Sequence, residues 1–259
     1  MKMIQIEQLT KVYKLNKKQQ KEMKIKDTQK IAVSDLSLTA KEGEIFGLLG
    51  TNGAGKTTTL RCLATLLKPT SGHIVVNGFD TVKDGKKVRE QIGFLTNEMK
   101  LDPQFSPNYL VDFFGRLHGM EENVIKKRKQ ELFEYFGIDE FADKRVEELS
   151  TGMKQKASIA VSLIHDPNVV IFDEPTTGLD IITARAVTDY LKELRNQGKL
   201  IIMSTHIMSE AEKLCDRIAT IIDGKKVEEG TIPEILKKTE TDDLEEAFFK
   251  LYQRYGKAV

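Results

Sequence analysis

The strongest constraint on this chain is the segment LLGTNGAGKTTT at residues 48–59. Gly50 and Gly55 flank four residues, and Lys56 and Thr57 follow, so the spacing GxxxxGK[ST] is met in full. Glycines let the backbone adopt positive φ and approach an anion, so that successive N–H groups point at phosphate oxygens. An apolar strand leads into the segment and a helix leads out, and a helix N-terminus favours negative charge. The segment therefore predicts a binding site for a nucleoside triphosphate.

Within this loop, the motif assigns Lys56 to the β- and γ-phosphates and the hydroxyl of Thr57 to Mg²⁺. A plain strand-to-helix connector is the alternative, but strand, loop, Lys-Thr and helix follow one another in the order that a phosphate site requires. The residues expected to hold the nucleotide are Gly50, Asn52, Gly53, Ala54, Gly55, Lys56, Thr57 and Thr58.

Length and charge set the broad class. A chain of 259 residues can bury one large α/β core, with or without a small subdomain. Its 40 basic and 39 acidic residues give a net charge of +1, so no overall field favours nucleic acid or an anionic membrane, and we expect no nucleic-acid partner. Cys62 and Cys215 lie in apolar or helical patterns, which is typical of reduced thiols in the cytoplasm. No apolar run approaches the roughly 20 residues of a membrane span, and no secretory signal is visible, so we expect a cytoplasmic chain.

Helical and strand patterns alternate in the second half of the chain. Residues 154–165 and 181–197 predict helices, and residues 169–172 and 200–204 predict strands. Such alternation implies parallel strands with crossover helices. We further expect residues 4–12 to form the edge strand of an antiparallel layer, a helix at 56–67, and a solvated hairpin at 14–30, which we favour over a membrane contact.

A helical subdomain is predicted at residues 97–149, where apolar residues recur at helical spacing. We interpret the stripe as subdomain core rather than as a ligand site; its residues include Phe105, Leu110, Phe113, Phe114 and Leu117. The nucleotide-binding core would then comprise residues 1–96 and 150–230. Residues 231–259 would form a tail of two short amphipathic helices.

The segment VVIFDE is an apolar strand that ends in two acids, Asp173 and Glu174. A buried carboxylate is costly without a partner, and a metal ion supplies one. We expect Asp173 to hold Mg²⁺ through water, and Glu174 to take a proton from the water that attacks the γ-phosphate. An acidic turn after a strand is the alternative, but the phosphate loop upstream favours the catalytic interpretation.

A third motif, LSTGM, places Ser150 where it can cap the following helix. The four segments GTNGAGKT, LSTGM, IFDEPTTGLD and MSTH follow the order found in ATP-binding-cassette (ABC) ATPases, and the resemblance spans essentially the whole chain. It implies an α/β P-loop fold of the ABC type, with a mostly parallel sheet, an antiparallel β layer and an inserted helical subdomain. ATP and Mg²⁺ are the implied ligands.

The resemblance also implies roles for single residues. Ser150 and Gly152 resemble the signature residues that contact the γ-phosphate of ATP held by a second copy of the chain. Asp180 resembles the residue that bridges the two copies, and His206 resembles the histidine that senses the γ-phosphate. Tyr13 matches the aromatic residue that stacks on adenine, although a surface tyrosine at a strand end is an alternative.

Three positions depart from the family pattern. The signature reads LSTGM rather than LSGGQ, which keeps Ser150 and Gly152. Asn97 stands where the family usually has a glutamine that helps bind Mg²⁺, and its shorter side chain requires a bridging water or a shifted loop. Tyr109 stands where relatives commonly have a glutamate that faces the membrane partner.

The sequence around these motifs resembles that of the ATPase subunits of sodium-extruding (NatA-type) ABC-2 exporters. This implies a separate integral membrane permease that docks on residues 97–149 at the cytoplasmic face of the membrane, and a head-to-tail dimer of two copies closed on ATP. The cargo could instead be a drug, lipid or peptide. DNA-maintenance ATPases carry long coiled coils before the signature, whereas two helices of ~20 residues reach only about 30 Å. Ribosome-bound factors usually carry two cassettes, and this chain has one.

Overall fold

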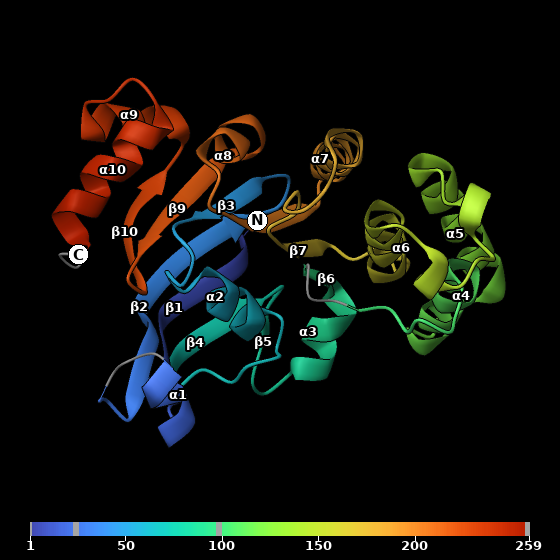
Figure 1. The fold of residues 1–259 in the computed structure, drawn as a ribbon, viewed down its shortest axis with the longest axis horizontal. Helices are drawn as coiled ribbons and strands as arrows, with labels where there is room; N and C mark the ends of the chain where they lie inside the picture. The colour runs from blue at the N-terminus through green and yellow to red at the C-terminus, as the bar shows by residue number, and fades with distance from the viewer. Residues whose placement is uncertain (1, 23–25, 97–99, 257–259) are drawn as a thin grey trace.

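The computed structural model describes residues 2–22, 26–96 and 100–256, which form a two-layer β framework covered by helices (Figure 1). Six strands form one sheet in the order β10-β9-β3-β8-β7-β6, and four form a second sheet in the order β2-β1-β4-β5. The strands are β1 (Lys2–Lys14), β2 (Gln29–Lys41), β3 (Ile45–Leu49), β4 (Ser71–Val76), β5 (Phe79–Asp80), β6 (Ile92–Thr96), β7 (Val169–Asp173), β8 (Leu200–Thr205), β9 (Arg217–Ile222) and β10 (Lys225–Gly230).

The described residues form ten α-helices, of which the last two follow the final strand. They are α1 (Lys17–Glu22), α2 (Lys56–Leu63), α3 (Gly85–Gln91), α4 (Pro107–Leu117), α5 (Glu122–Phe136), α6 (Thr151–Leu163), α7 (Ile181–Asn196), α8 (Met208–Leu214), α9 (Ile232–Thr239) and α10 (Leu244–Tyr255). No helix in the described ranges is both long and apolar enough to cross a membrane.

The larger sheet confirms the predicted α/β fold. Strands β9, β3, β8, β7 and β6 pair in parallel, and only β10 is antiparallel to its neighbour β9. All residues of β3, β7 and β8 are buried. Helices or the second sheet cover both faces of a parallel sheet, so its strands are apolar on both sides.

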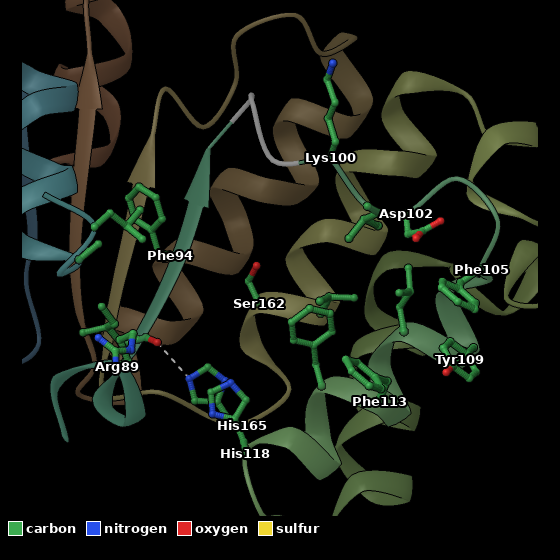
Figure 2. Close-up of a pocket in the computed structure, with 17 residues that line it drawn as sticks. Arg89, Phe94, Lys100, Asp102, Phe105, Tyr109, Phe113, His118, Ser162 and His165 are labelled. Atoms are coloured by element: carbon green, nitrogen blue, oxygen red, sulfur yellow. Dashed lines mark hydrogen bonds between the residues drawn. The ribbon is translucent and has the colours of Figure 1, made fainter. Parts of the chain in front are cut away.

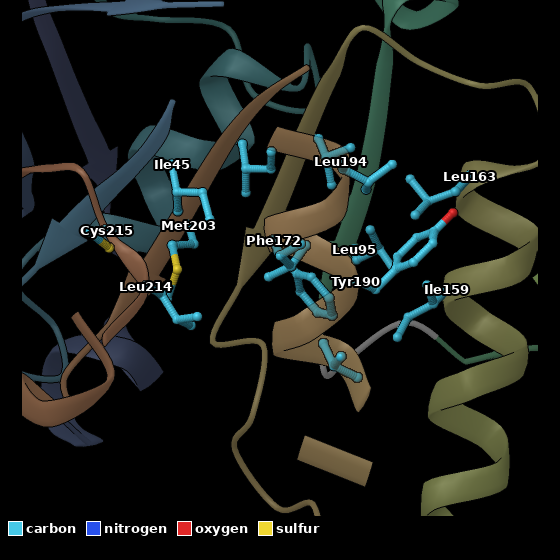
Figure 3. Close-up of a cluster of buried hydrophobic side chains, with 14 of the residues drawn as sticks. Ile45, Leu95, Ile159, Leu163, Phe172, Tyr190, Leu194, Met203, Leu214 and Cys215 are labelled. Carbon is cyan, nitrogen blue, oxygen red and sulfur yellow. The ribbon is translucent and has the colours of Figure 1, made fainter. Parts of the chain in front are cut away.

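Alternate residues of β3 enter two different hydrophobic clusters. Ile45 and Leu49 join the cluster that α6 and α7 cover, where the ring of Tyr190 extends from α7 toward Leu163 of α6 (Figure 3). Phe46 and Leu48 join the cluster beneath α2 and the antiparallel sheet. The period-two alternation of strand side chains therefore ties both layers to the strand that carries the phosphate loop.

Two predictions about individual elements are wrong. Strand β1 is not an edge strand, because it pairs with β2 on one side and with β4 on the other. Its mixed polar and apolar pattern shows which face is buried, not how many neighbours the strand has. The helix after the phosphate loop ends at Leu63 rather than at residue 67, and Thr65 takes a left-handed φ of 63° that does not continue a helix.

The helices α4, α5 and α6 pack against one another at one end of the molecule (Figure 1). Leu110 is buried there, as predicted, and Phe133 and Phe136 of α5 belong to the same hydrophobic cluster. Phe105, Phe113 and Leu117 are instead 39%, 46% and 67% exposed, so the interpretation of the stripe as core is wrong for these residues. Helical spacing shows that α4 has apolar faces but not which of them the fold covers. The division of the chain at residues 97 and 149 stays a prediction.

The tail forms two helices, as predicted. Ile235 of α9 and Leu244, Ala247 and Leu251 of α10 are buried in the same hydrophobic cluster as the large sheet. Helix α10 contacts α8, α9 and β9. The last helices are therefore part of the fold's main core.

Candidate nucleotide site

Three neighbouring strands place the phosphate loop, the acidic pair and His206 at one edge of the large sheet. Strand β8 lies between β3 and β7, and all three run in parallel. Thr205 of β8 is aligned with Leu49 of β3, and Ser204 with Asp173 of β7. The carboxyl ends of parallel strands form the usual ligand-binding edge of an α/β sheet. The phosphate loop, the acidic pair and His206 consequently meet.

The phosphate loop needs glycine at specific positions. An added Cβ at Gly50 would collide with the carbonyl oxygen of Ile221, and one at Gly55 would collide with that of Ala32. Gly55 precedes α2 with a φ of 110°, and Gly53 has a φ of 83°. L-residues with side chains rarely adopt such angles. The loop backbone is thus packed closely against β2 on one side and the end of β9 on the other.

Lys56 begins α2 and is only 4% exposed. Its Nζ donates to the carbonyl oxygens of Gly50 at 2.7 Å and Thr51 at 3.1 Å. Burial lowers the pKa of Lys56, and the nearby carboxylates of Glu174 and Asp173 counteract that shift. The lysine therefore lies inside the loop, close to both acids.

A cavity of about 180 Å³ opens beside this loop. The residues that line it are Tyr13, Lys30, Ala32, Asn52, Gly53, Gly55, Lys56, Thr57, Thr58 and Glu174. The hydroxyl of Tyr13 lies 3.4 Å from Oγ1 of Thr58. Ala54, which belongs to the loop, is buried and does not line the cavity. Most of the predicted nucleotide-contacting residues thus surround one space, together with two residues of β2, Lys30 and Ala32, that the motifs did not indicate.

Glu174 follows β7 in a left-handed conformation with a φ of 55°. Its N–H donates to the backbone oxygen of Ser204 at 3.2 Å and to Ser204 Oγ at 3.1 Å. Thr177 Oγ1 donates to one carboxylate oxygen at 3.1 Å, and Nδ1 of His206 lies 3.0 Å from the other. Contacts with Ser204, Thr177 and His206 therefore stabilise the strained backbone of Glu174 and fix the direction of its carboxylate.

Asp173 accepts a hydrogen bond from Ser204 Oγ, and both residues are buried. Ser204 thus orients both acids; it lies in the MSTH segment, where the motif assigned a role to His206 alone. Glu210 is a second residue that the motifs missed: its carboxylate accepts from Thr205 Oγ1 and, at 2.7 Å, from Thr176 Oγ1. It joins the loop after Glu174 to the end of β8. The sequence signal was the presence of hydroxyl residues in both segments: Thr176 and Thr177 follow Glu174, and Ser204 and Thr205 precede His206.

Ser150, Gly152 and Asp180 form a second group. Ser150 caps α6 by accepting from Met153 N at 3.3 Å. Asp180 caps α7, and Thr183 donates to it from N at 3.0 Å and from Oγ1 at 2.8 Å, which lowers the pKa of Asp180. A Cβ on Gly152 would stand 3.3 Å from Asp180 Oδ2 and 3.1 Å from Thr183 Oγ1.

This second group is separate from the cavity. None of its three predicted residues is among the described residues that line it. The structure thus places the predicted site residues in two groups on one chain. Asn97 lies outside the described residues, and its predicted role in Mg²⁺ binding stays a prediction.

The donor set fits Mg²⁺. Thr57 lines the cavity in the first turn of α2, and Glu174, which follows Asp173 at the end of β7, lines the same cavity. Mg²⁺ prefers hard oxygen ligands and is usually held by one or two side-chain oxygens plus water and substrate phosphates. The chain supplies oxygens of that kind where the phosphates would enter.

A buried parallel sheet, a glycine loop with a lysine inside it, and an acidic pair at the adjacent strand end define a P-loop nucleoside triphosphatase. A family model described as "ABC transporter" matches residues 33–177. The chain therefore belongs to the ABC transporter family, and it is an ATPase of that family.

Similar proteins cover most of the chain. "ABC transporter ATP-binding protein NatA" of Bacillus subtilis is 41% identical over 228 residues, or 87% of this chain and 93% of the relative. "Nod factor export ATP-binding protein I" of Burkholderia lata is 40% identical over 78% of this chain and 66% of the relative. A solved dimeric ATP-binding cassette bound to ADP and Pi, MJ0796, superposes with a TM-score of 0.78 at 27% identity, covering 88% of this chain and 98% of that one.

Proposed function

We propose that this chain is the ATP-hydrolysing subunit of a bacterial exporter and drives a separate membrane permease from the cytoplasmic face of the membrane. The observation that carries the proposal is Glu174, held between Thr177 and His206 at the wall of the cavity that contains Lys56. A relative named for Nod factor export and the similarity to NatA support an exporter.

The side chains divide the chemistry of hydrolysis among them. Lys56 and the loop N–H groups bind the β- and γ-phosphates, and Tyr13 stacks on the adenine. Glu174 accepts a proton from the attacking water, while His206, on the other side of that carboxylate, faces the γ-phosphate. Thr57 and Asp173 would hold Mg²⁺, which when bound neutralises charge on the phosphates.

A second copy completes the site in this proposal. Ser150, Gly152 and Asp180 lie together but outside their own chain's cavity, so they are available to ATP held by another copy. The N-terminus of α6 suits a γ-phosphate because its first N–H groups point outward. The dimeric solved relative supports a head-to-tail pair in which two copies form two complete sites.

The permease docks, we propose, over an apolar cavity of about 680 Å³ between the end of the large sheet and helices α4 and α6 (Figure 2). Phe105, Tyr109 and Phe113 form an exposed ladder along it, with ring centroids 4.5 and 6.2 Å apart. Exposed aromatic rings beside a large apolar cavity are typical of a protein-binding surface. Sodium is the proposed cargo on the similarity to NatA; a drug, lipid or peptide is the alternative.

The Glu174→Gln variant tests the catalytic role and the dimer together. Removing the carboxylate should lower ATP turnover by about 10²-fold or more while leaving ATP binding in place. ATP with Mg²⁺ should then hold the variant as a dimer in gel filtration. Glu245→Gln is the matched control, since Glu245 is exposed on α10. A Glu174→Gln protein that stays monomeric with ATP and Mg²⁺ would refute the head-to-tail site.

The alternative function is a soluble ABC-type ATPase that acts on ribosomes or DNA. Turnover should rise only with a membrane partner if the exporter proposal holds. Stimulation by purified ribosomes or by duplex DNA would instead support the alternative.

A further inference from the structure

Lys30 lies beside the base-binding end of the nucleotide cavity. Strands β1 and β2 pair Tyr13 directly with Lys30, and both residues line the cavity. Directly opposed residues of antiparallel strands project from the same face of the sheet. Lys30 and Tyr13 thus point into the same space, although Lys30 belongs to the lysine-rich segment predicted to be only a solvated hairpin.

Strand β2 also sets the distance between Lys30 and the phosphate loop. Two residues after Lys30, the carbonyl oxygen of Ala32 packs so closely on Gly55 that a Cβ there would collide with it. Two residues of antiparallel strand advance about 7 Å. Lys30 therefore lies about 7 Å along the strand from the loop, on the side of Tyr13. If the base lies on Tyr13 and the terminal phosphates lie in the loop, the ribose and α-phosphate fall between them.

The charges around the cavity single out this lysine. Lys56 is bonded to the loop carbonyls, and the Nζ of Lys11, which lies 5.5 Å from the centre of the Tyr13 ring, donates to the backbone oxygen of Lys68 at 2.8 Å. Among the described residues, the half-buried Lys30 has no hydrogen bond or ion pair on its ammonium group. Its long flexible stem lets the ammonium move toward an anion in the cavity.

We propose that Lys30 is a nucleotide-binding residue whose ammonium group pairs with the α-phosphate. This inference rests on the proposed function, because it uses the same bound nucleotide. ATP and ADP both carry the α-phosphate, so the contact is the same before and after hydrolysis. An interaction that is equal in the ground and transition states lowers KM without changing kcat.

The Lys30→Gln variant tests this role by calorimetric titration with ATP and ADP and by competition with adenosine. We expect the Kd of both ATP and ADP to rise about three- to tenfold, as the loss of one partly exposed charge-assisted contact would give. Adenosine affinity should be unchanged, since adenosine has no phosphate. In steady-state ATPase assays KM should rise by a similar factor with kcat unchanged.

Lys14→Gln is the matched control. Lys14 follows Tyr13 in β1, is exposed and points to the opposite face of the strand, so the variant loses the same charge nearby without facing the cavity. The proposal is overturned if the two variants bind ATP equally well, if adenosine weakens as much as ADP, or if kcat falls. A wild-type chain that binds no ATP would instead refute the proposed function itself.

Discussion

Ser204 shows, at the scale of a single residue, how the fold positions the two acids that we propose for catalysis. One hydroxyl donates to the carboxylate of Asp173 and accepts from the N–H of Glu174. The two acids follow β7, whereas Ser204 belongs to β8, so the contact depends on the parallel pairing of these strands. The spatial relation of the acids to one another is therefore set by a neighbouring strand.

The Ser204→Ala variant should be less stable and less active. It leaves a buried carboxylate without its donor, which costs about 1–3 kcal/mol. The free energy of unfolding, measured by denaturant titration, should fall by that amount, and kcat should fall more than ATP affinity. Thr188→Ala is the control, since it removes an exposed hydroxyl that bonds only within α7. Equal stability of the two variants would contradict the role assigned to Ser204.

Motifs predicted most of the residues around the cavity of the phosphate loop but not the residues that position them. The loop, Asp173, Glu174 and His206 lie in short segments whose spacing itself encodes the chemistry. Ser204 lies on β8, Glu210 on α8 and Lys30 on β2, and which elements are neighbours in the fold cannot be read from local spacing. Similarly, the sequence gives no means to tell that Gly50 and Gly55 are packed against Ile221 and Ala32.

At the scale of elements, a pair of histidines in the wall of the apolar cavity joins two helices. His118 follows α4 and His165 follows α6, and their rings stack at 3.8 Å between centroids (Figure 2). One ring nitrogen of His165 lies 3.0 Å from the backbone oxygen of Ile92, at the start of β6. The pair therefore connects the helical end of the molecule to the sheet.

Acidification should weaken this connection. Burial, with His118 as a second cause, lowers the pKa of His165 to about 4, and burial also lowers the pKa of His118. An unfolded histidine titrates near 6.5, so the unfolded chain binds more protons between pH 6.5 and 4, and stability falls as pH drops through that window. For His165 the loss approaches about 3 kcal/mol.

Denaturant titrations at pH 7.5 and pH 4.5 measure this loss. Carboxylates also contribute to acid unfolding, so the informative quantity is the difference from the His165→Gln variant. Between these two pH values, the free energy of unfolding of the variant should fall by roughly 2 kcal/mol less than that of the wild type. Parallel losses in the two proteins would show that His165 does not titrate with unfolding.

Element types were largely predictable, because apolar runs and helical periods are strong in this chain. The parallel sheet, its crossover helices and both tail helices follow from such patterns. The inner position of β1 and the exposed face of α4 do not, since each depends on which partner covers a surface. The hydrophobic period of a sequence shows which residues are suited to burial. It does not distinguish a face that the fold covers from an apolar face that stays exposed.

At the scale of the whole molecule, the C-terminal helices α9 and α10 are part of the main hydrophobic core. Leu244 is 1% exposed within the cluster that includes β3 and β7, while Phe249 on the same helix is 58% exposed. Leu244→Ala should lower the free energy of unfolding by about 2–4 kcal/mol, because it leaves a cavity.

Phe249→Ala is the paired control and should change stability by less than about 0.5 kcal/mol. Thermal unfolding followed by circular dichroism would measure both. A tail that unfolds in a separate early transition, with the rest of the protein unaffected by Leu244→Ala, would contradict this view of the core.

Helix α6 connects the surface that holds Ser150 to the wall of the apolar cavity. Ser150 caps its beginning, and Val161 and Ser162 line the apolar cavity near its end. Thirteen residues of α-helix make a stiff rod about 20 Å long. Tilting such a rod by about 10° about its first turn displaces its far end by about 3 Å. A displacement of this size is enough to separate packed side chains, so α6 can act mechanically as a lever between the surface proposed to face the partner's ATP and the surface proposed to face the permease.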